Sequence, residues 1–272
     1  MPVLLGAACA ARAVELNSSV LACILAGAIS IQIGTNFAND YADFKSGADT
    51  AQRLGPTRVT QAGLLRPRAV KWGANLMFAL ALVCGVPLMI IGGWPIVTIG
   101  AASLICGWAY TSGPYPLGYH GLGELFVILF FGFAAVLGTV YLLTGEWSAL
   151  GAVVAVVPAC HASALLAANN LRDLDTDRLA GKHTLAVRFG RGFARAEFAA
   201  LMLVPFIVPL VLYANGLSAW ILLPLLTVPL GWRGVRIAWT AEHGRDVIPA
   251  FKYTALLLTT FGVLFTIGLI AG

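Results

Sequence analysis

Residues 70–92 read VKWGANLMFALALVCGVPLMIIG, and residues 94–111 read WPIVTIGAASLICGWAYT. No charged residue occurs after Lys71 in these two runs. A helix rises about 1.5 Å per residue, so about 20 apolar residues cross the roughly 30 Å hydrocarbon core of a bilayer. The two runs therefore predict two consecutive transmembrane helices. Similar apolar runs occur along the rest of the chain.

The composition agrees with a membrane protein. Of 272 residues, 59% are hydrophobic and 11% are charged, whereas a soluble domain carries about 25% charged residues. This excludes a water-soluble globule. We predict an all-α, polytopic membrane helical bundle of about nine transmembrane helices, forming a single integral-membrane domain over residues 1–272. The expected spans are 2–14, 18–38, 70–92, 94–111, 122–144, 148–168, 194–214, 217–232 and 250–271.

The positions of the basic residues predict how this bundle is oriented in the membrane. With nine spans, sixteen of the seventeen Lys and Arg residues fall on one face, and only Arg12 falls on the other. Such an excess marks the cytoplasmic side. The prediction is a multi-pass protein of the cell inner (cytoplasmic) membrane, with its N-terminus inside and its C-terminus outside. The net charge of +5 is then a consequence of topology, and we expect no nucleic acid partner.

The carboxylates are unevenly distributed. Six of the twelve acidic residues lie in two short segments, one following the second span and one following the sixth. Asn36-x-x-x-Asp40 in the first segment matches Asn169-x-x-x-Asp173 in the second. Because these segments end helices that are four spans apart, they suggest duplicated four-helix units.

Helical spacing places these acids on stripes. Asn36, Asp40 and Asp43 stand at i, i+4 and i+7, and Asn169, Asp173 and Asp177 stand at i, i+4 and i+8. Two facing carboxylate stripes would repel each other unless a divalent cation lay between them. Oxygen ligands without Cys or His favour Mg²⁺, which usually keeps substrate phosphates among its ligands. The candidate metal ligands are Asp40, Asp43, Asp173 and Asp177, with Asp49 and Asp175 as second-rank candidates.

Basic residues accompany the acids. Lys45, Arg58, Arg172 and Lys182 lie in the same two segments and could hold phosphate oxygens. The alternative is that they are ordinary basic residues of cytoplasmic loops. Acids for Mg²⁺ beside bases for phosphate, at the mouth of an apolar bundle, describe a site for a charged head with a hydrocarbon tail. A polyprenyl diphosphate has this chemistry.

Several local motifs carry a family resemblance. They are Asn39-Asp40-Tyr41-Ala42-Asp43 through Gly47 and Asp49, Gly55-Pro56-Thr57-Arg58, Tyr110-Thr111-Ser112-Gly113-Pro114, Gly121-Leu122-Gly123-Glu124, Asn169-Asn170-Leu171-Arg172-Asp173, and Asp177 through Gly181-Lys182. The chain resembles the UbiA superfamily of intramembrane aromatic prenyltransferases, and within it the 1,4-dihydroxy-2-naphthoate polyprenyltransferases of menaquinone synthesis. Two departures stand out. Gly47 replaces a third Asp of many members, and relatives usually have further residues before the first helix.

The resemblance implies a Mg²⁺-dependent transfer of a polyprenyl group to an aromatic acceptor, with 1,4-dihydroxy-2-naphthoate losing its carboxyl group to give demethylmenaquinol and diphosphate. The four aspartates Asp40, Asp43, Asp173 and Asp177 would hold the metal that stabilises the leaving group. Glu124 would position the acceptor or pair with a base. Asparagines would complete the ligation, and aromatic rings would stabilise an allyl cation or form an interfacial belt. The asparagines are Asn36, Asn39, Asn169 and Asn170, and the aromatic residues are Tyr41, Trp108, Tyr110, Tyr115 and Tyr119.

Three alternatives remain open. An ion-coupled transporter would place its acids near the bilayer midplane, whereas these acids cluster at the ends of spans. A related prenyltransferase would use another acceptor, such as 4-hydroxybenzoate, homogentisate or a phytyl-accepting naphthoate. A CDP-alcohol phosphotransferase would need a contiguous Asp-Gly…Ala-Arg…Gly…Asp…Asp motif, which the sequence lacks.

Overall fold

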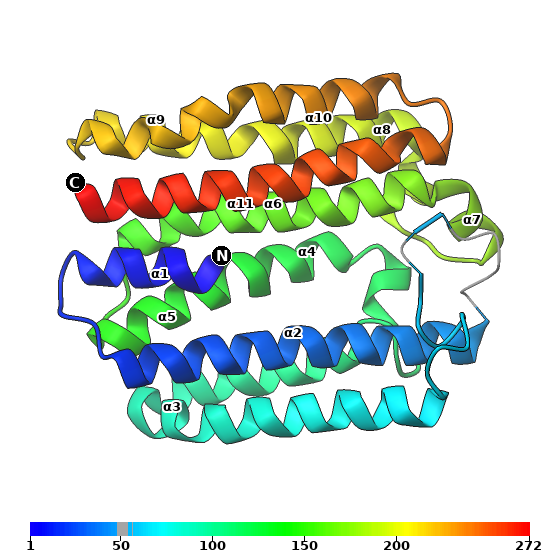
Figure 1. The fold of residues 1–272 in the computed structure, drawn as a ribbon, viewed down its shortest axis with the longest axis horizontal. Helices are drawn as coiled ribbons and strands as arrows, with labels where there is room; N and C mark the ends of the chain where they lie inside the picture. The colour runs from blue at the N-terminus through cyan, green and yellow to red at the C-terminus, as the bar shows by residue number, and fades with distance from the viewer. Residues whose placement is uncertain (48–53, 56) are drawn as a thin grey trace.

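The computed structural model describes residues 1–47, 54–55 and 57–272, and this part of the chain is helical without any strand (Figure 1). The elements are α1 (Pro2–Ala11), α2 (Ser18–Ser46), α3 (Pro67–Ala109), η1 (Leu117–His120), α4 (Gly123–Val127), η2 (Ile128–Ala134), α5 (Ala135–Thr144), α6 (Ala149–Arg172), α7 (Leu174–Leu179), α8 (Leu185–Leu203), η3 (Val204–Phe206), α9 (Ile207–Ala214), η4 (Ala219–Thr227), α10 (Val228–Thr240), η5 (Gly244–Val247) and α11 (Ile248–Ala271).

The nine predicted spans correspond to these helices. Within the described residues, seven continuous helical stretches are long and apolar enough to cross a membrane. One of them, α3, folds back on itself at Gly93 (φ 62°, ψ −153°) and supplies two of the predicted spans. The ninth is α1, which has ten residues. The all-helical bundle is thus confirmed, with a first helix shorter than a full span.

Several helices extend beyond the predicted apolar windows. α2 continues to Ser46 and α6 to Arg172 because their Asn- and Asp-bearing ends remain helical after the apolar run stops. α8 is assigned from Leu185, but Gly190 (φ 82°, ψ 175°) interrupts it, so a short helical segment over 185–189 precedes a long helix that begins close to the predicted start at 194. At the end of α2, Gly47 adopts a left-handed conformation (φ 72°), which favours glycine and stops the helix.

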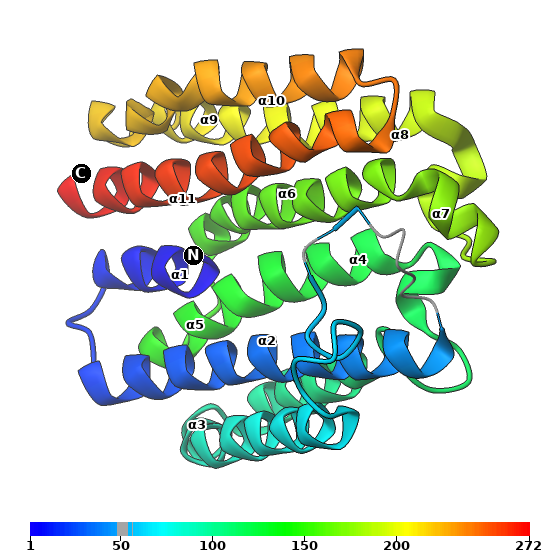
Figure 2. The ribbon, with the colours of Figure 1, turned by 45° about the vertical axis from the view of Figure 1, so that its right-hand side comes forward.

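The helices form a bundle with two outer sides and a middle (Figures 1 and 2). α2 and the two arms of α3 lie on one side, and α8, α9 and α10 lie on the other. α1, α4, α5, α6 and α11 lie between them. The C-terminal end of α2 and the α6–α7 junction both lie at the right-hand end of Figure 1, so the two Asp-bearing segments share one end of the molecule.

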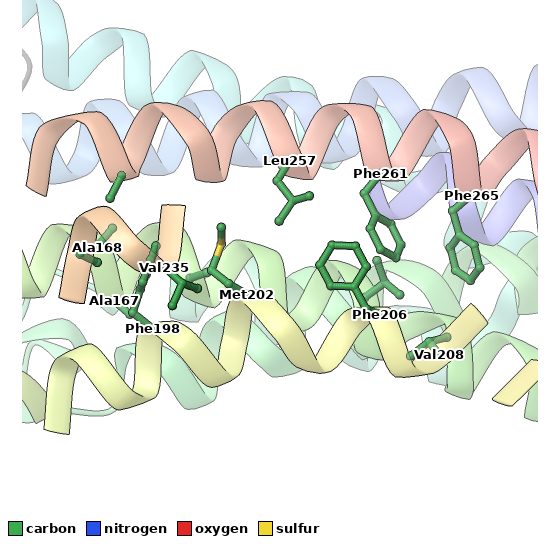
Figure 3. Packing of buried hydrophobic residues seen from close by; sticks show 14 of the residues in the cluster. Ala167, Ala168, Phe198, Met202, Phe206, Val208, Val235, Leu257, Phe261 and Phe265 are labelled. Carbon is green, nitrogen blue, oxygen red and sulfur yellow. The ribbon is translucent and has the colours of Figure 1, made fainter. Parts of the chain in front are cut away.

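The packed core lies between α6, α8 and α11 (Figure 3). Phe198 and Met202 of α8 are fully buried there, together with Phe261 and Phe265 of α11. The opposite face of α6 carries small residues, and Gly132 of η2 approaches it so closely that a Cβ at this glycine would overlap Ala159. Close contact between small residues is the usual way for helices to associate in lipid, where apolar burial provides little driving force. It holds α6 firmly beside the segment that carries Glu124.

Candidate active site

The end of α2 turns two carboxylates inward. Asp40 and Asp43 are only 6% and 5% exposed. The carboxylate of Asp40 accepts hydrogen bonds from the backbone N–H groups of Val59 (3.1 Å) and Thr60 (3.3 Å). The carboxylate of Asp43 accepts a hydrogen bond from the Tyr119 hydroxyl (2.7 Å) and pairs with Arg58 (3.3 Å). The predicted stripe therefore forms, and each of its acids already has polar partners.

The second carboxylate segment has a break that the spacing does not predict. α6 ends at Arg172 and α7 begins at Leu174, so the stripe is not one continuous helix. The i,i+4 relation survives, because the Asp177 N–H still donates to the Asp173 carbonyl (2.7 Å). Arg172 grips the Asp173 carboxylate with two hydrogen bonds of 2.8 and 2.6 Å.

Tyr119 and Lys182 bridge the two segments. The Lys182 ammonium lies 3.2 Å from a carboxylate oxygen of Asp177 and 4.8 Å from the centre of the Tyr119 ring. Tyr119 in turn donates its hydroxyl hydrogen bond to Asp43. Its backbone carbonyl accepts from the His183 N–H (2.7 Å). A chain of contacts thus runs from Asp43 through Tyr119 and Lys182 to Asp177, and it joins the ends of α2 and α7.

The pKa of Asp177 reflects the proximity of the two segments. Burial raises the pKa of Asp177, the positive charge of Lys182 lowers it, and the negative charges of Asp173 and Asp43 raise it further. Asp43 belongs to the other segment, so the two helix ends are close enough for their charges to interact. A cluster of like charges of this kind favours either a proton or a bound cation.

The remaining predicted polar residues fall into three groups. Asn39 accepts a hydrogen bond from Thr111 (2.7 Å), and Asn170 donates one to the buried carboxylate of Glu124 (2.6 Å). Both pairs lie beside the aspartates along the chain. Asn36 lines the central cavity. Asn169 contributes its backbone carbonyl, which accepts from the Asp173 N–H (2.9 Å).

Two predicted residues, Lys45 and Asp175, stand apart from this cluster. Lys45 is exposed and lines a different pocket from the one that Asn36 and Asn39 line. Asp175 is exposed and pairs with Arg191 at 3.0 Å. Asp49 lies outside the described residues.

An apolar cavity of about 610 Å³ opens from this end of the bundle. α2, both arms of α3 and the α4–α5 segment line it, with Asn36, Asn39 and Tyr110 among its polar residues. The wall includes η2, whose residues form a π-helical turn. Phe126 and Phe130 on that wall lie stacked with ring centres 6.1 Å apart. Such a cavity can hold a flexible hydrocarbon chain whose polar head lies near the aspartates.

Two contacts of the site residues were not predicted from the sequence. The backbone N–H groups of Val59 and Thr60, which directly follow the motif Gly55-Pro56-Thr57-Arg58, donate to Asp40, and a main-chain donor leaves no signal in the pattern of side chains. Thr111 holds Asn39, and only its place in the motif Tyr110-Thr111-Ser112-Gly113-Pro114 hints at this. Tyr110, by contrast, was predicted. It lines the apolar cavity together with Asn36 and Asn39.

Comparison with known proteins places the chain in a family. The model of the UbiA prenyltransferase family matches residues 1–256. The chain is 36% identical over 241 residues to 1,4-dihydroxy-2-naphthoate octaprenyltransferase of Mycobacterium tuberculosis, covering 88% of this chain and 81% of the relative. It is 31% identical to the protein of the same name from Bacillus subtilis, over 99% of this chain and 87% of that one.

Solved structures share the fold. A UbiA homolog from Aeropyrum pernix superposes with a TM-score of 0.74 at 18% identity, over 97% of this chain and 94% of the other. A UbiA homolog from Archaeoglobus fulgidus, bound to DMAPP and Mg²⁺, superposes with a TM-score of 0.63 at 13% identity and the same coverage. By the match of its sequence over nearly the whole length, this chain belongs to the UbiA prenyltransferase family.

Proposed function

We propose that this protein transfers a polyprenyl group from an allylic polyprenyl diphosphate to 1,4-dihydroxy-2-naphthoate, with loss of carbon dioxide and release of diphosphate. The observation that carries the proposal is the chain of contacts that links Asp43 through Tyr119 and Lys182 to Asp177, at the end of the bundle where Asn39 lines an apolar cavity. Relatives at 31–36% identity that bear the name 1,4-dihydroxy-2-naphthoate octaprenyltransferase support the choice of acceptor.

The residues at the two helix ends fit Mg²⁺. The donors are carboxylate oxygens, which suit a hard cation. Among the described residues no three His, Cys, Asp or Glu side chains are gathered around one point. Mg²⁺ usually takes one or two carboxylates and completes its shell with substrate phosphates and water. Asp43 and Asp177 would hold it first, with Asp40 and Asp173 beside them. When bound, it supplies charge stabilisation to the departing diphosphate.

Each cation of the site forms an ion pair with one of the aspartates. Arg58 pairs with Asp43, Arg172 with Asp173 and Lys182 with Asp177. Each cation would turn from its carboxylate to the phosphate oxygens as the substrate enters, since phosphate offers the same oxygen geometry with more charge. Lys182 is the best placed of the three because it already lies between the two segments.

The acceptor would approach the allylic carbon from the side of Glu124, Asn170 and Tyr110. The carbon–oxygen bond of the prenyl diphosphate breaks, and the ring carbon that bears the carboxylate attacks the allylic carbon. The carbon–carboxylate bond then breaks, and its electron pair restores the aromatic ring. The cavity, which the Tyr110 ring lines, would keep water from the allyl cation.

We also propose that the site faces the cytoplasmic side of the membrane. The segments that carry the site also carry most of the described basic residues, which favours the cytoplasmic face of a bacterial inner membrane. A water-soluble acceptor would enter from this side, while the prenyl chain stays within the bilayer.

The test uses purified protein with Mg²⁺, a polyprenyl diphosphate and a panel of aromatic acceptors, with mass spectrometry of the products. We expect prenylated, decarboxylated naphthoate, with no product from 4-hydroxybenzoate or homogentisate. Asp177→Asn should abolish product, whereas Asp175→Asn, which changes an exposed and surface-paired carboxylate two residues away, should retain it. Equal activity of the two variants, or preference for another acceptor, would overturn the proposal.

A further inference from the structure

A second cavity lies beside the site and is not used by the proposed reaction. It measures about 490 Å³ and is enclosed by α2, by both arms of α3 and by the 111–119 loop. It takes residues from a different face of α2 than the prenyl cavity does: Ala38, Ala42 and Lys45 line this one, whereas Asn36 and Asn39 line the other. The two cavities are therefore separate compartments at the same end of the bundle.

The charge of this cavity has one sign. Among the residues that the structure describes, Lys45 and Lys71 line it and no carboxylate does. Neither lysine has an ion-pair partner among the residues that the structure describes, although Lys71 lies 5.7 Å from the centre of the Tyr41 ring. The cations of the active site differ, since Arg58, Arg172 and Lys182 each pair with an aspartate. Two lysines without counter-ions in one concave site attract an anion.

The surroundings belong to the membrane interface. Trp72 and Trp108, on the two arms of α3, are 65% and 52% exposed near the cavity. Tryptophan is enriched at the level of the lipid headgroups. Ala74 and Phe78 continue the wall along α3 away from the lysines and provide an apolar surface. A ligand with an anionic head and a hydrocarbon tail matches both parts of this wall.

We propose that this cavity binds the headgroup of an anionic phospholipid, with its phosphate between Lys45 and Lys71. Basic pockets between transmembrane helices on the cytoplasmic side suit such headgroups. The cavity also touches the active site, because Tyr119 and Thr111 line it and donate hydrogen bonds to Asp43 and Asn39. A lipid seated here holds the end of α2 in the arrangement that the site requires.

Native mass spectrometry of the protein released from nanodiscs of mixed phosphatidylcholine and phosphatidylglycerol tests this directly. We expect the wild type to retain phosphatidylglycerol in preference to phosphatidylcholine. Lys71→Gln should weaken this retention about fivefold, the effect of one basic residue near anionic lipid, and Lys45→Gln with Lys71→Gln about 25-fold. The single variant keeps the test usable if the double variant is unstable.

The matched control is Arg233→Gln with Arg236→Gln, which removes the same charge from the exposed face of α10. It should retain the lipid as the wild type does. Equal loss in the control would mean that general surface charge, not the cavity, holds the lipid, and would overturn the proposal. So would displacement of the lipid by millimolar inorganic phosphate or by the aromatic acceptor, because the cavity would then be a site for a soluble anion. None of these results depends on the transferase activity.

Discussion

The ionised carboxylate of Asp177, which the proposed Mg²⁺ binding requires, lowers the stability of the folded protein. Its pKa is raised, mainly by burial, so the folded state holds the proton more tightly than the unfolded chain does. The ionised carboxylate therefore costs folding free energy, and this cost appears as the pH rises from the ordinary pKa of 3.8 through the raised value. We expect Asp177→Asn to melt at the same or a higher temperature than the wild type at pH 8. The difference should shrink at pH 4. A lower melting temperature at pH 8 would contradict the assignment.

Tyr119 acts through its hydroxyl as well as its ring. Tyr119→Phe removes the 2.7 Å hydrogen bond to Asp43 and leaves the ring beneath Lys182. A hydrogen bond to a charged group contributes about 1.5 kcal/mol or more, so we expect kcat/KM to fall about tenfold. Tyr115→Phe is the control, because Tyr115 is exposed and contacts His120 through its ring, which the substitution keeps. Equal activity of the two variants would contradict a role of the Tyr119 hydroxyl in the reaction.

At the level of the element, α3 depends on one glycine. Gly93 has φ 62° and ψ −153°, a region that is essentially restricted to glycine. The turn there lets the second arm run back along α2, so that Thr111 reaches Asn39. We expect Gly93→Ala to destabilise the protein by about 1–3 kcal/mol. Gly85→Ala is the control, since a Cβ there meets only Met89 at an ordinary 3.6 Å. Thermal melting in detergent compares them, and similar melting temperatures would argue against a required turn.

At the scale of the whole molecule, we predict that the cavity sets the length of the prenyl chain. Gly138 lines it, and a Cβ there would meet only Ile99, at 3.8 Å. Gly138→Phe should therefore direct its ring into the cavity, so that long polyprenyl diphosphates react poorly while short ones still react. Product analysis with donors of different length measures this. Leu226→Phe, on an exposed residue outside the cavity, is the control. An unchanged preference in Gly138→Phe would mean that the chain lies elsewhere.

The fold followed from the apolar runs, and its exceptions have physical reasons. Hydropathy finds segments that must avoid water, so it located every span but ended α2 and α6 where their polar residues begin. It also missed the short helical segment over 185–189, which carries Arg188 and is separated from the long part of α8 by the break at Gly190. The fold-back at Gly93 is visible in the sequence only as two adjacent spans.

The site was predictable where helical spacing alone decides it. Asp40 and Asp43 are brought inward together, as their spacing requires. Lys45, however, stands two residues after Asp43, and about 200° around a helix of 3.6 residues per turn. It lines another cavity, and its predicted contact with the substrate stays a prediction. The contact between Tyr119 and Asp43 joins residues 76 positions apart, which no local pattern encodes.

The central claim is that Asp43 and Asp177 act together on one metal-bound diphosphate. Calorimetric titration of an unreactive prenyl diphosphate analogue, with and without Mg²⁺, measures this in the wild type, Asp43→Asn, Asp177→Asn and the double variant. We predict Mg²⁺-dependent binding that either single substitution largely removes, with little further loss in the double variant, because residues sharing one ligand are not additive. Binding that is independent of Mg²⁺, or losses that simply add, would contradict the account.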